Sequence, residues 1–193
     1  MKKVAIFASG SGSNAQKIIE YLDEKDDAEV TLVLSNNSDA FVLERADNFE
    51  IPTHVFSRNE FYKEESVLDL LIRLDIDLVV LAGFLWLIPK YILDSFPSRI
   101  VNIHPALLPK YGGKGMYGKK VHQAVLDAGE KGSGVTIHYV NDIYDEGEII
   151  GQHECPIETG ETLDSLAFKV HQLEYCHYPK AIYNILKKIN KPE

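Results

Sequence analysis

The chain has 193 residues, of which 45% are hydrophobic and 25% are charged, so we expect one globular domain over residues 1–193. Its 20 Lys and Arg residues against 29 Asp and Glu residues give a formal net charge of −9 and a pI near 5.3. This acidity argues against nucleic acid or an anionic membrane as a partner, because both bind clustered cations.

The first predicted element is a buried strand at residues 4–8 (VAIFA), which follows two lysines. Its apolar stretch is shorter than the roughly seven to fifteen residues of a signal-peptide core. No apolar run approaches the ~18 residues that a membrane span needs. Cys155 and Cys176 form neither a CxxC pair nor a zinc spacing. We therefore expect a cytoplasmic protein without a membrane segment or a metal site.

Strand and helix patterns then alternate along the chain, which indicates a parallel sheet covered by helices. Strands are predicted at residues 30–34, 54–56, 78–81, 100–103, 135–140 and 148–152. Helices are predicted at 14–21, 40–49, 60–74, from 89, at 121–128, and after Thr162, where Pro179 kinks or splits the helix. We expect an α/β, doubly wound, mostly parallel sheet with helices on both faces and an antiparallel edge strand.

A glycine-rich turn at residues 10–14 (GSGSN) joins the first strand to the first helix. Glycines allow close backbone approach, and a helix N-terminus offers N–H groups to a phosphate. With Ala15 the string fits the dinucleotide pattern, but Asn36 and Asn37 stand where that motif needs an acidic residue. We favour a monophosphate site with Gly12, Ser13 and Asn14 as donors; a tight turn without a ligand is the alternative.

The apolar run at residues 84–88 (FLWLI) follows the end of a predicted strand. Such a run is typical of a core. It could equally form the wall for a flat aromatic ligand at the carboxyl edge of the sheet.

The strand at residues 100–103 leads into His104 and Pro105. A residue before proline is held extended, so Asn102 and His104 project to the same face at the end of the strand. An amide and an imidazole there can hydrogen-bond a substrate and move a proton. A histidine that merely caps the strand is the alternative.

The turn at residues 141–147 is acidic and contains Asp145. A solvated turn is the simpler interpretation. If the turn folds over His104, the Asp145 carboxylate would raise the histidine pKa. A histidine poised in this way contributes about 10² to 10⁴ in rate as a general acid or base.

Residues 102–109 (NIHPALLP) resemble the N-I-H-P-x-L-L-P segment of enzymes that use 10-formyltetrahydrofolate. Nearly the whole chain is similar to the phosphoribosylglycinamide formyltransferases, folate-dependent enzymes of purine synthesis with a Rossmann-like fold. The likeness also covers residues 10–14, residues 79–84, the Asp145 turn and Glu174 with the Tyr178-Pro179 pair.

The resemblance implies a site and a reaction. Gly12, Ser13 and Asn14 would hold the acceptor's phosphate, and Glu174 would lie on the acceptor side. The folate pocket would be lined by Leu85, Trp86, Leu87, Ile88 and Asn102. The catalytic set would be Asn102, His104 and Asp145, with His104 as general acid, kept protonated by Asp145, during direct attack of the glycinamide amine. The co-substrate would be 10-formyltetrahydrofolate, and no metal would be needed.

The chain departs from the family at three places. Trp86 stands where many members have arginine. The folate-contacting arginine has no clear counterpart, with Arg58 and Lys63 as the candidates. The loop at residues 112–119 is longer than in many members.

Other functions remain open from the sequence. They are a formylfolate hydrolase, a transferase to methionyl-tRNA or an amino sugar, a nicotinamide dehydrogenase and a non-catalytic nucleotide-binding module. Transferases that act on tRNA carry an extra C-terminal domain and the hydrolases an N-terminal one, and we expect neither. We expect small-molecule substrates, no nucleic acid and a monomer or homodimer.

Overall fold

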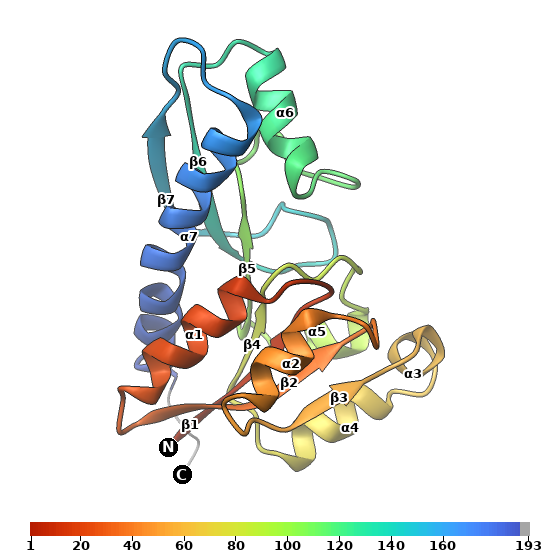
Figure 1. Ribbon diagram of the computed structural model, residues 1–193. Helices are drawn as coiled ribbons and strands as arrows, with labels where there is room; N and C mark the ends of the chain where they lie inside the picture. The colour runs from red at the N-terminus through yellow and green to blue at the C-terminus, as the bar shows by residue number, and fades with distance from the viewer. Residues whose placement is uncertain (190–193) are drawn as a thin grey trace.

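The computed structural model describes residues 1–189, so the last four residues of the expected domain 1–193 lie outside the described part. A seven-stranded sheet in the order β3-β2-β1-β4-β5-β6-β7 runs through the molecule (Figure 1). The strands are β1 (Lys2–Phe7), β2 (Ala28–Ser35), β3 (Thr53–Val55), β4 (Leu78–Leu81), β5 (Ile100–His104), β6 (Gly132–Tyr139) and β7 (Ile149–Pro156). The helices are α1 (Ser13–Asp23), α2 (Phe41–Asp47), α3 (Arg58–Tyr62), α4 (Ser66–Arg73), α5 (Lys90–Ser95), α6 (Lys119–Asp127) and α7 (Leu163–Leu186).

Five neighbouring strands, β3 to β5 in the sheet order, are parallel. Strand β6 is antiparallel to β5, and β7 is antiparallel to β6. This confirms the predicted doubly wound, mostly parallel sheet with an antiparallel edge. The antiparallel pairing begins one strand earlier than the predicted hairpin, because β5 itself pairs with β6.

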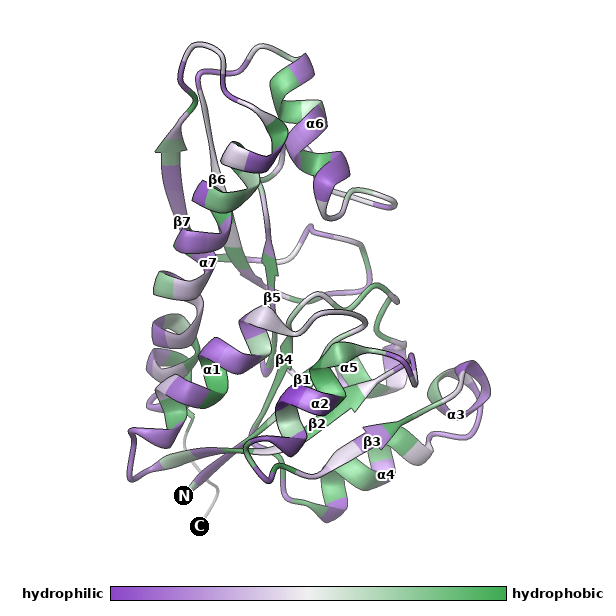
Figure 2. Ribbon diagram, in the orientation of Figure 1, coloured by the Kyte–Doolittle hydropathy of each residue, from purple (hydrophilic) through white to green (hydrophobic). Residues whose placement is uncertain are grey.

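Two hydrophobic cores lie on the two faces of the sheet. Alternate residues of β1 point to opposite faces, so Ile6 packs in one core and Phe7 in the other. The first core contains residues of α1, α2, α6 and α7, and the second contains residues of α3, α4 and α5. Figure 2 shows hydrophobic residues interspersed with hydrophilic ones along α1 and α6, because each helix buries only one of its faces.

The single helix predicted over residues 60–74 is wrong, because two helices occupy this stretch. Helix α3 begins early, since Ser57 and Glu60 form a reciprocal capping box at its N-terminus. The helical conformation is interrupted before α4, where Glu65 takes a left-handed conformation with φ of 56°. Hydrophobic residues do recur at helical spacing within α4, but this spacing does not reveal the interruption between α3 and α4.

Helix α7 runs unbroken through Pro179, so the predicted split does not occur. Tyr178, the residue before Pro179, is fully buried. Its hydroxyl lies 2.9 Å from the Leu81 carbonyl oxygen and 3.2 Å from the Val101 carbonyl oxygen. These carbonyls belong to β4 and β5, so α7 is tied to the centre of the sheet beside the proline.

After β1 the chain adds β2 and β3 on one side of that strand, and it later adds β4 and β5 on the other side. The strand order therefore reverses between β1 and β4. The turns that follow these two strands are joined: the Ser9 N–H donates to the Gly83 carbonyl at 3.0 Å, and the Leu85 N–H donates to the Ser9 hydroxyl at 3.1 Å. Such a switch point is where ligands bind in open α/β sheets. Within residues 1–189, no helix is long and apolar enough to cross a membrane.

Candidate active site

A cavity of about 560 Å³ opens at the carboxyl ends of β4 and β5, beside the turn that follows β1. Its walls include residues 81–88, residues 102–105, the loop at residues 113–118, the turn at residues 140–145 and Glu174 of α7. Segments from five regions of the chain therefore meet at the switch point, where the fold predicts a ligand.

The wall predicted to bind folate is present, because Leu85, Trp86, Leu87 and Ile88 all line the cavity together with Asn102. The Trp86 ring packs on Phe56 and Phe61, with ring centroids 6.0 Å and 5.9 Å apart. The run at residues 84–88 is thus part of the core and part of the cavity wall, since Phe84 and Ile88 are buried while Leu85 is 47% exposed.

Of the two candidates for the missing arginine, Arg58 lies against this wall. Its guanidinium stacks 5.0 Å from the Tyr62 ring centroid and 5.5 Å from that of Trp86. Lys63 follows at the C-terminus of α3. Neither side chain lines the cavity itself.

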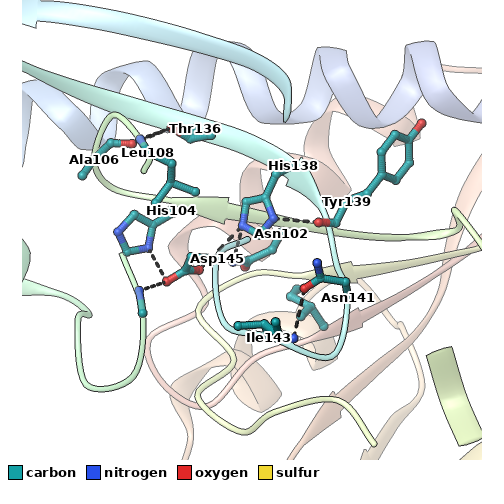
Figure 3. A network of polar contacts seen from close by, with 12 residues as sticks. Asn102, His104, Ala106, Leu108, Thr136, His138, Tyr139, Asn141, Ile143 and Asp145 are labelled. Carbon is teal, nitrogen blue, oxygen red and sulfur yellow. Dashed lines mark hydrogen bonds and ion pairs between the residues drawn. The ribbon is translucent and has the colours of Figure 1, made fainter. Parts of the chain in front are cut away.

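The imidazole of His104 is buried at the end of β5 and meets two acceptors, of which Figure 3 shows the Asp145 carboxylate. Nε2–H donates to the Tyr111 carbonyl at 2.8 Å, and Nδ1 lies 3.4 Å from Asp145 Oδ2. Both bonds need a proton on the ring nitrogen. The pair of acceptors therefore favours the imidazolium, although the Asp145 contact is long.

The sequence led us to expect a raised pKa for His104, and the structure corrects this. Burial lowers the pKa of His104 below its ordinary value, and this outweighs the raising effects of the Asp145 carboxylate and the Tyr111 carbonyl. The sequence made Asp145 a partner of His104 only if the acidic turn folds over the strand end, and it could not give the depth of the ring.

Asp145 joins three segments of the site (Figure 3). It has a positive φ of 58°, its Oδ2 accepts the Gly113 N–H at 2.9 Å, and its Oδ1 lies 3.7 Å from His138 Nε2. Burial raises the pKa of Asp145, but the contacts with His138, His104 and the Gly113 N–H together lower it. Asp145 therefore stays a carboxylate beside His104.

His138 is a site residue that sequence reasoning missed. It pairs with Asn102 across the antiparallel register of β5 and β6, and its Nε2 lies 3.2 Å from the Asn102 side-chain nitrogen. Its Nδ1–H donates to the Tyr139 carbonyl at 2.7 Å, and its Nε2 faces one N–H of Asn102 at 3.2 Å and Asp145 Oδ1 at 3.7 Å. The other N–H stays available at the cavity. The only feature of the sequence that could have pointed to His138 is that it is a histidine within a predicted strand.

The exit of β5 is held by Thr136 (Figure 3). Its hydroxyl donates to the Ala106 carbonyl at 2.7 Å and accepts the Leu108 N–H at 3.0 Å. Thr136 stands opposite His104 in the strand register. The segment after His104 is therefore anchored to β6, which fixes where the imidazole lies.

The residues predicted to hold phosphate lie between β1 and α1, at the other side of the cavity. Asn14 lines the cavity with Ser11, whereas Gly12 and Ser13 do not. Gly12 is buried with φ of 70°, and an added Cβ would lie 2.4 Å from Val42 Cγ2. Packing against α2 therefore requires this glycine, whatever the turn binds.

Glu174 of α7 meets this turn. Its Oε2 accepts from Asn14 Nδ2 at 2.9 Å, and its side chain is only 6% exposed. Burial raises the pKa of Glu174 to about 7, although the Asn14 hydrogen bond lowers it. His122 and His171, which the sequence did not single out, line the same end, and burial lowers the pKa of His122 to about 4. Within residues 1–189, no group of three or more His, Cys, Asp or Glu side chains could hold a metal ion.

Comparisons with known proteins show the family to which the chain is similar. The family model described as formyl transferase matches residues 2–182. The chloroplastic phosphoribosylglycinamide formyltransferase of Arabidopsis thaliana is 41% identical over 94% of this chain, which spans 64% of that protein. The enzyme of that name from Bacillus subtilis is 36% identical over 100% of this chain and 99% of its own length. The crystal structure of glycinamide ribonucleotide transformylase 1 from Symbiobacterium toebii has a TM-score of 0.89 at 32% identity, covering 100% of this chain and 91% of that one.

Proposed function

The chain belongs to the formyl transferase family, and we propose that it transfers the formyl group of 10-formyltetrahydrofolate to the amine of 5-phosphoribosylglycinamide. This reaction is a step of purine biosynthesis. The observation that carries the proposal is the cavity itself, because Asn102, His104 and Asp145 lie between an apolar wall and the turn before α1. One cavity can therefore hold a flat donor and a phosphorylated acceptor on either side of one imidazole.

The folate ring packs against residues 85–88, and the acceptor lies toward Asn14 and Glu174. The phosphate reaches this turn at Ser11 and Asn14, which line the cavity, and the backbone N–H groups of Gly12, Ser13 and Asn14 at the start of α1 bind it. Glu174 binds the acceptor from α7. These placements bring the glycinamide amine to the formyl carbon beside His104.

Transfer is direct. The amine nitrogen attacks the formyl carbon, and the carbonyl oxygen becomes an oxyanion. Asn102 donates its free N–H to that oxygen, since its other N–H is held by His138. His104 donates from Nδ1, whose contact with Asp145 is long at 3.4 Å, because Nε2–H is held by the Tyr111 carbonyl at 2.8 Å. Donors aimed at developing charge in a buried site stabilise the transition state.

Proton transfer completes the reaction. The oxyanion collapses to the amide carbonyl, and the bond from the formyl carbon to the folate nitrogen breaks as that nitrogen takes a proton from His104. The proton that the attacking amine loses passes to the neutral His104 and restores the imidazolium. A histidine whose pKa is lowered by burial is a stronger acid when protonated. Asp145 opposes this lowering, so the imidazolium remains accessible.

Small-molecule substrates fit this cavity. We propose that the protein binds no nucleic acid, because its formal net charge is −9. We also propose a cytoplasmic location, a single domain and a monomer or homodimer.

The test is loss of formylfolate followed by absorbance, with and without 5-phosphoribosylglycinamide. Consumption that depends on the acceptor supports the proposal, and acceptor-independent consumption indicates a hydrolase. His104→Ala should lower kcat by about 10² to 10⁴ with an unchanged circular dichroism spectrum. Full activity in this variant would remove the mechanism.

A further inference from the structure

The loop at residues 113–118 carries Lys114, the only lysine or arginine among the described residues that line the cavity. The same walls also carry two acidic residues, Asp145 and Glu174. The formal net charge of the protein is also −9. An anionic substrate therefore enters a site whose one permanent cation is Lys114.

Lys114 lies at the tip of a tight turn. The Met116 N–H donates to the Gly113 carbonyl at 3.1 Å, and Gly115 has φ of 89°, as the third position of a type II turn requires. This geometry places Lys114 at the second position, with an exposed side chain. The turn therefore places Lys114 on the cavity wall as an exposed residue.

The lysines around Lys114 are engaged, whereas Lys114 has no ion pair or hydrogen bond within residues 1–189. Lys110 pairs with Glu130 and Lys119 pairs with Asp164. Lys120 lies 4.9 Å from the Tyr117 ring centroid. The one lysine on the cavity wall is thus the one without a partner in this region.

The loop is fixed at its ends and has room in between. The Gly113 N–H is held by Asp145, and the Val121 N–H donates to the Gly118 carbonyl at 3.1 Å. Gly113, Gly115 and Gly118 have positive φ values, and a Cβ on any of them would meet nothing within 4 Å. Nothing packed at these positions prevents the turn from moving toward a ligand.

We propose that Lys114 is a specificity-determining residue that binds the phosphate of the acceptor, opposite the turn before α1. The inference rests on the proposed function, because it takes its phosphate from that acceptor. Ser11 and Asn14 line the same cavity as Lys114, so the phosphate lies between backbone N–H groups and one ammonium group. A charge-assisted bond of this kind distinguishes a phosphorylated acceptor from an unphosphorylated one.

The experiment compares full-length wild type, Lys114→Ala, Lys114→Arg and the control Lys119→Ala. The control removes the same charge near the same loop, from a residue that does not line the cavity. Calorimetry measures the Kd for 5-phosphoribosylglycinamide without folate, and kinetics measures KM for each substrate. Lys114→Ala should raise Kd and KM for the acceptor about tenfold or more, with kcat and the formylfolate KM within about twofold. Lys114→Arg should keep most of the affinity, because it keeps the charge.

A second arm uses glycinamide riboside, which lacks the phosphate. The preference in kcat/KM for the phosphorylated acceptor should fall about tenfold or more in Lys114→Ala, while kcat/KM for the riboside stays unchanged. An unchanged acceptor Kd, an equal loss in Lys119→Ala, or a change confined to the formylfolate KM would each overturn the inference. A wild-type protein that formylates no acceptor would instead refute the proposed function.

Discussion

At the scale of single residues, the chemistry depends on what each ring nitrogen of His104 contacts. One nitrogen is held by a backbone carbonyl and the other faces a carboxylate at 3.4 Å. Burial and the carboxylate act on the pKa in opposite directions, and burial has the larger effect. The protonation state of His104 is therefore a balance that one substitution can change.

Asp145→Asn tests this balance. The variant removes the charge that raises the pKa of His104 and leaves burial unopposed, so the His104 pKa should fall. Protonated His104 is then lost at a lower pH, and kcat at neutral pH should fall about tenfold to a hundredfold. The pH dependence of kcat and a nuclear magnetic resonance titration of His104 measure this. A titration identical to that of wild type would contradict the coupling.

At the scale of elements, helix α7 serves both the fold and the site. It brings Glu174 to Asn14 and, one turn later, buries Tyr178 against the carbonyls of β4 and β5. Leu81 lines the cavity, and Val101 precedes the lining residue Asn102. The position of α7 therefore sets where Glu174 lies at the cavity wall.

Tyr178→Phe should lower the free energy of unfolding by about 1–2 kcal/mol, because two buried carbonyls lose their shared donor. Urea denaturation measures this loss. The control is Tyr183→Phe on the same helix, whose hydroxyl donates to Asp27 in an exposed contact at 3.0 Å. It should change stability by less than about 0.5 kcal/mol. Equal losses in both variants would show that Tyr178 has no special anchoring role.

At the scale of the whole molecule, the cavity has a cost in stability. Glu174 is buried with a pKa raised to about 7 from an ordinary value of 4.5. Between these values the folded state binds more protons than the unfolded state, so this group lowers stability as pH rises from about 4.5 to about 7. The carboxyl group lies at the cavity wall and keeps one hydrogen bond there, from Asn14.

Glu174→Gln should remove this pH dependence while keeping an acceptor oxygen for Asn14. Relative to wild type, its free energy of unfolding should rise by up to about 3 kcal/mol at pH 8 and change little at pH 4. Urea denaturation at both pH values measures this, with the exposed Glu154→Gln as the control for the loss of one charge. Equal pH dependence in Glu174→Gln and wild type would refute the assignment. The affinity for 5-phosphoribosylglycinamide should also fall in Glu174→Gln.

Most of the fold follows from local patterns in the chain. Continuous apolar runs such as residues 78–81 are recognisable as buried parallel strands, because both faces of the sheet are covered. The glycine turn and the segment at residues 102–109 likewise carry their chemistry in adjacent residues. The sequence alone thus determined the sheet, the position of His104 at a strand end and the candidate residues at the carboxyl edge.

The tertiary structure decided the relations between distant residues. The β5–β6 register placed His138 beside Asn102, the burial of His104 outweighed the effect of Asp145 on its pKa, and α7 brought Glu174 to Asn14. The physical reason is that register and depth depend on the packing of whole elements, whereas hydrophobic periodicity depends only on neighbours along the chain.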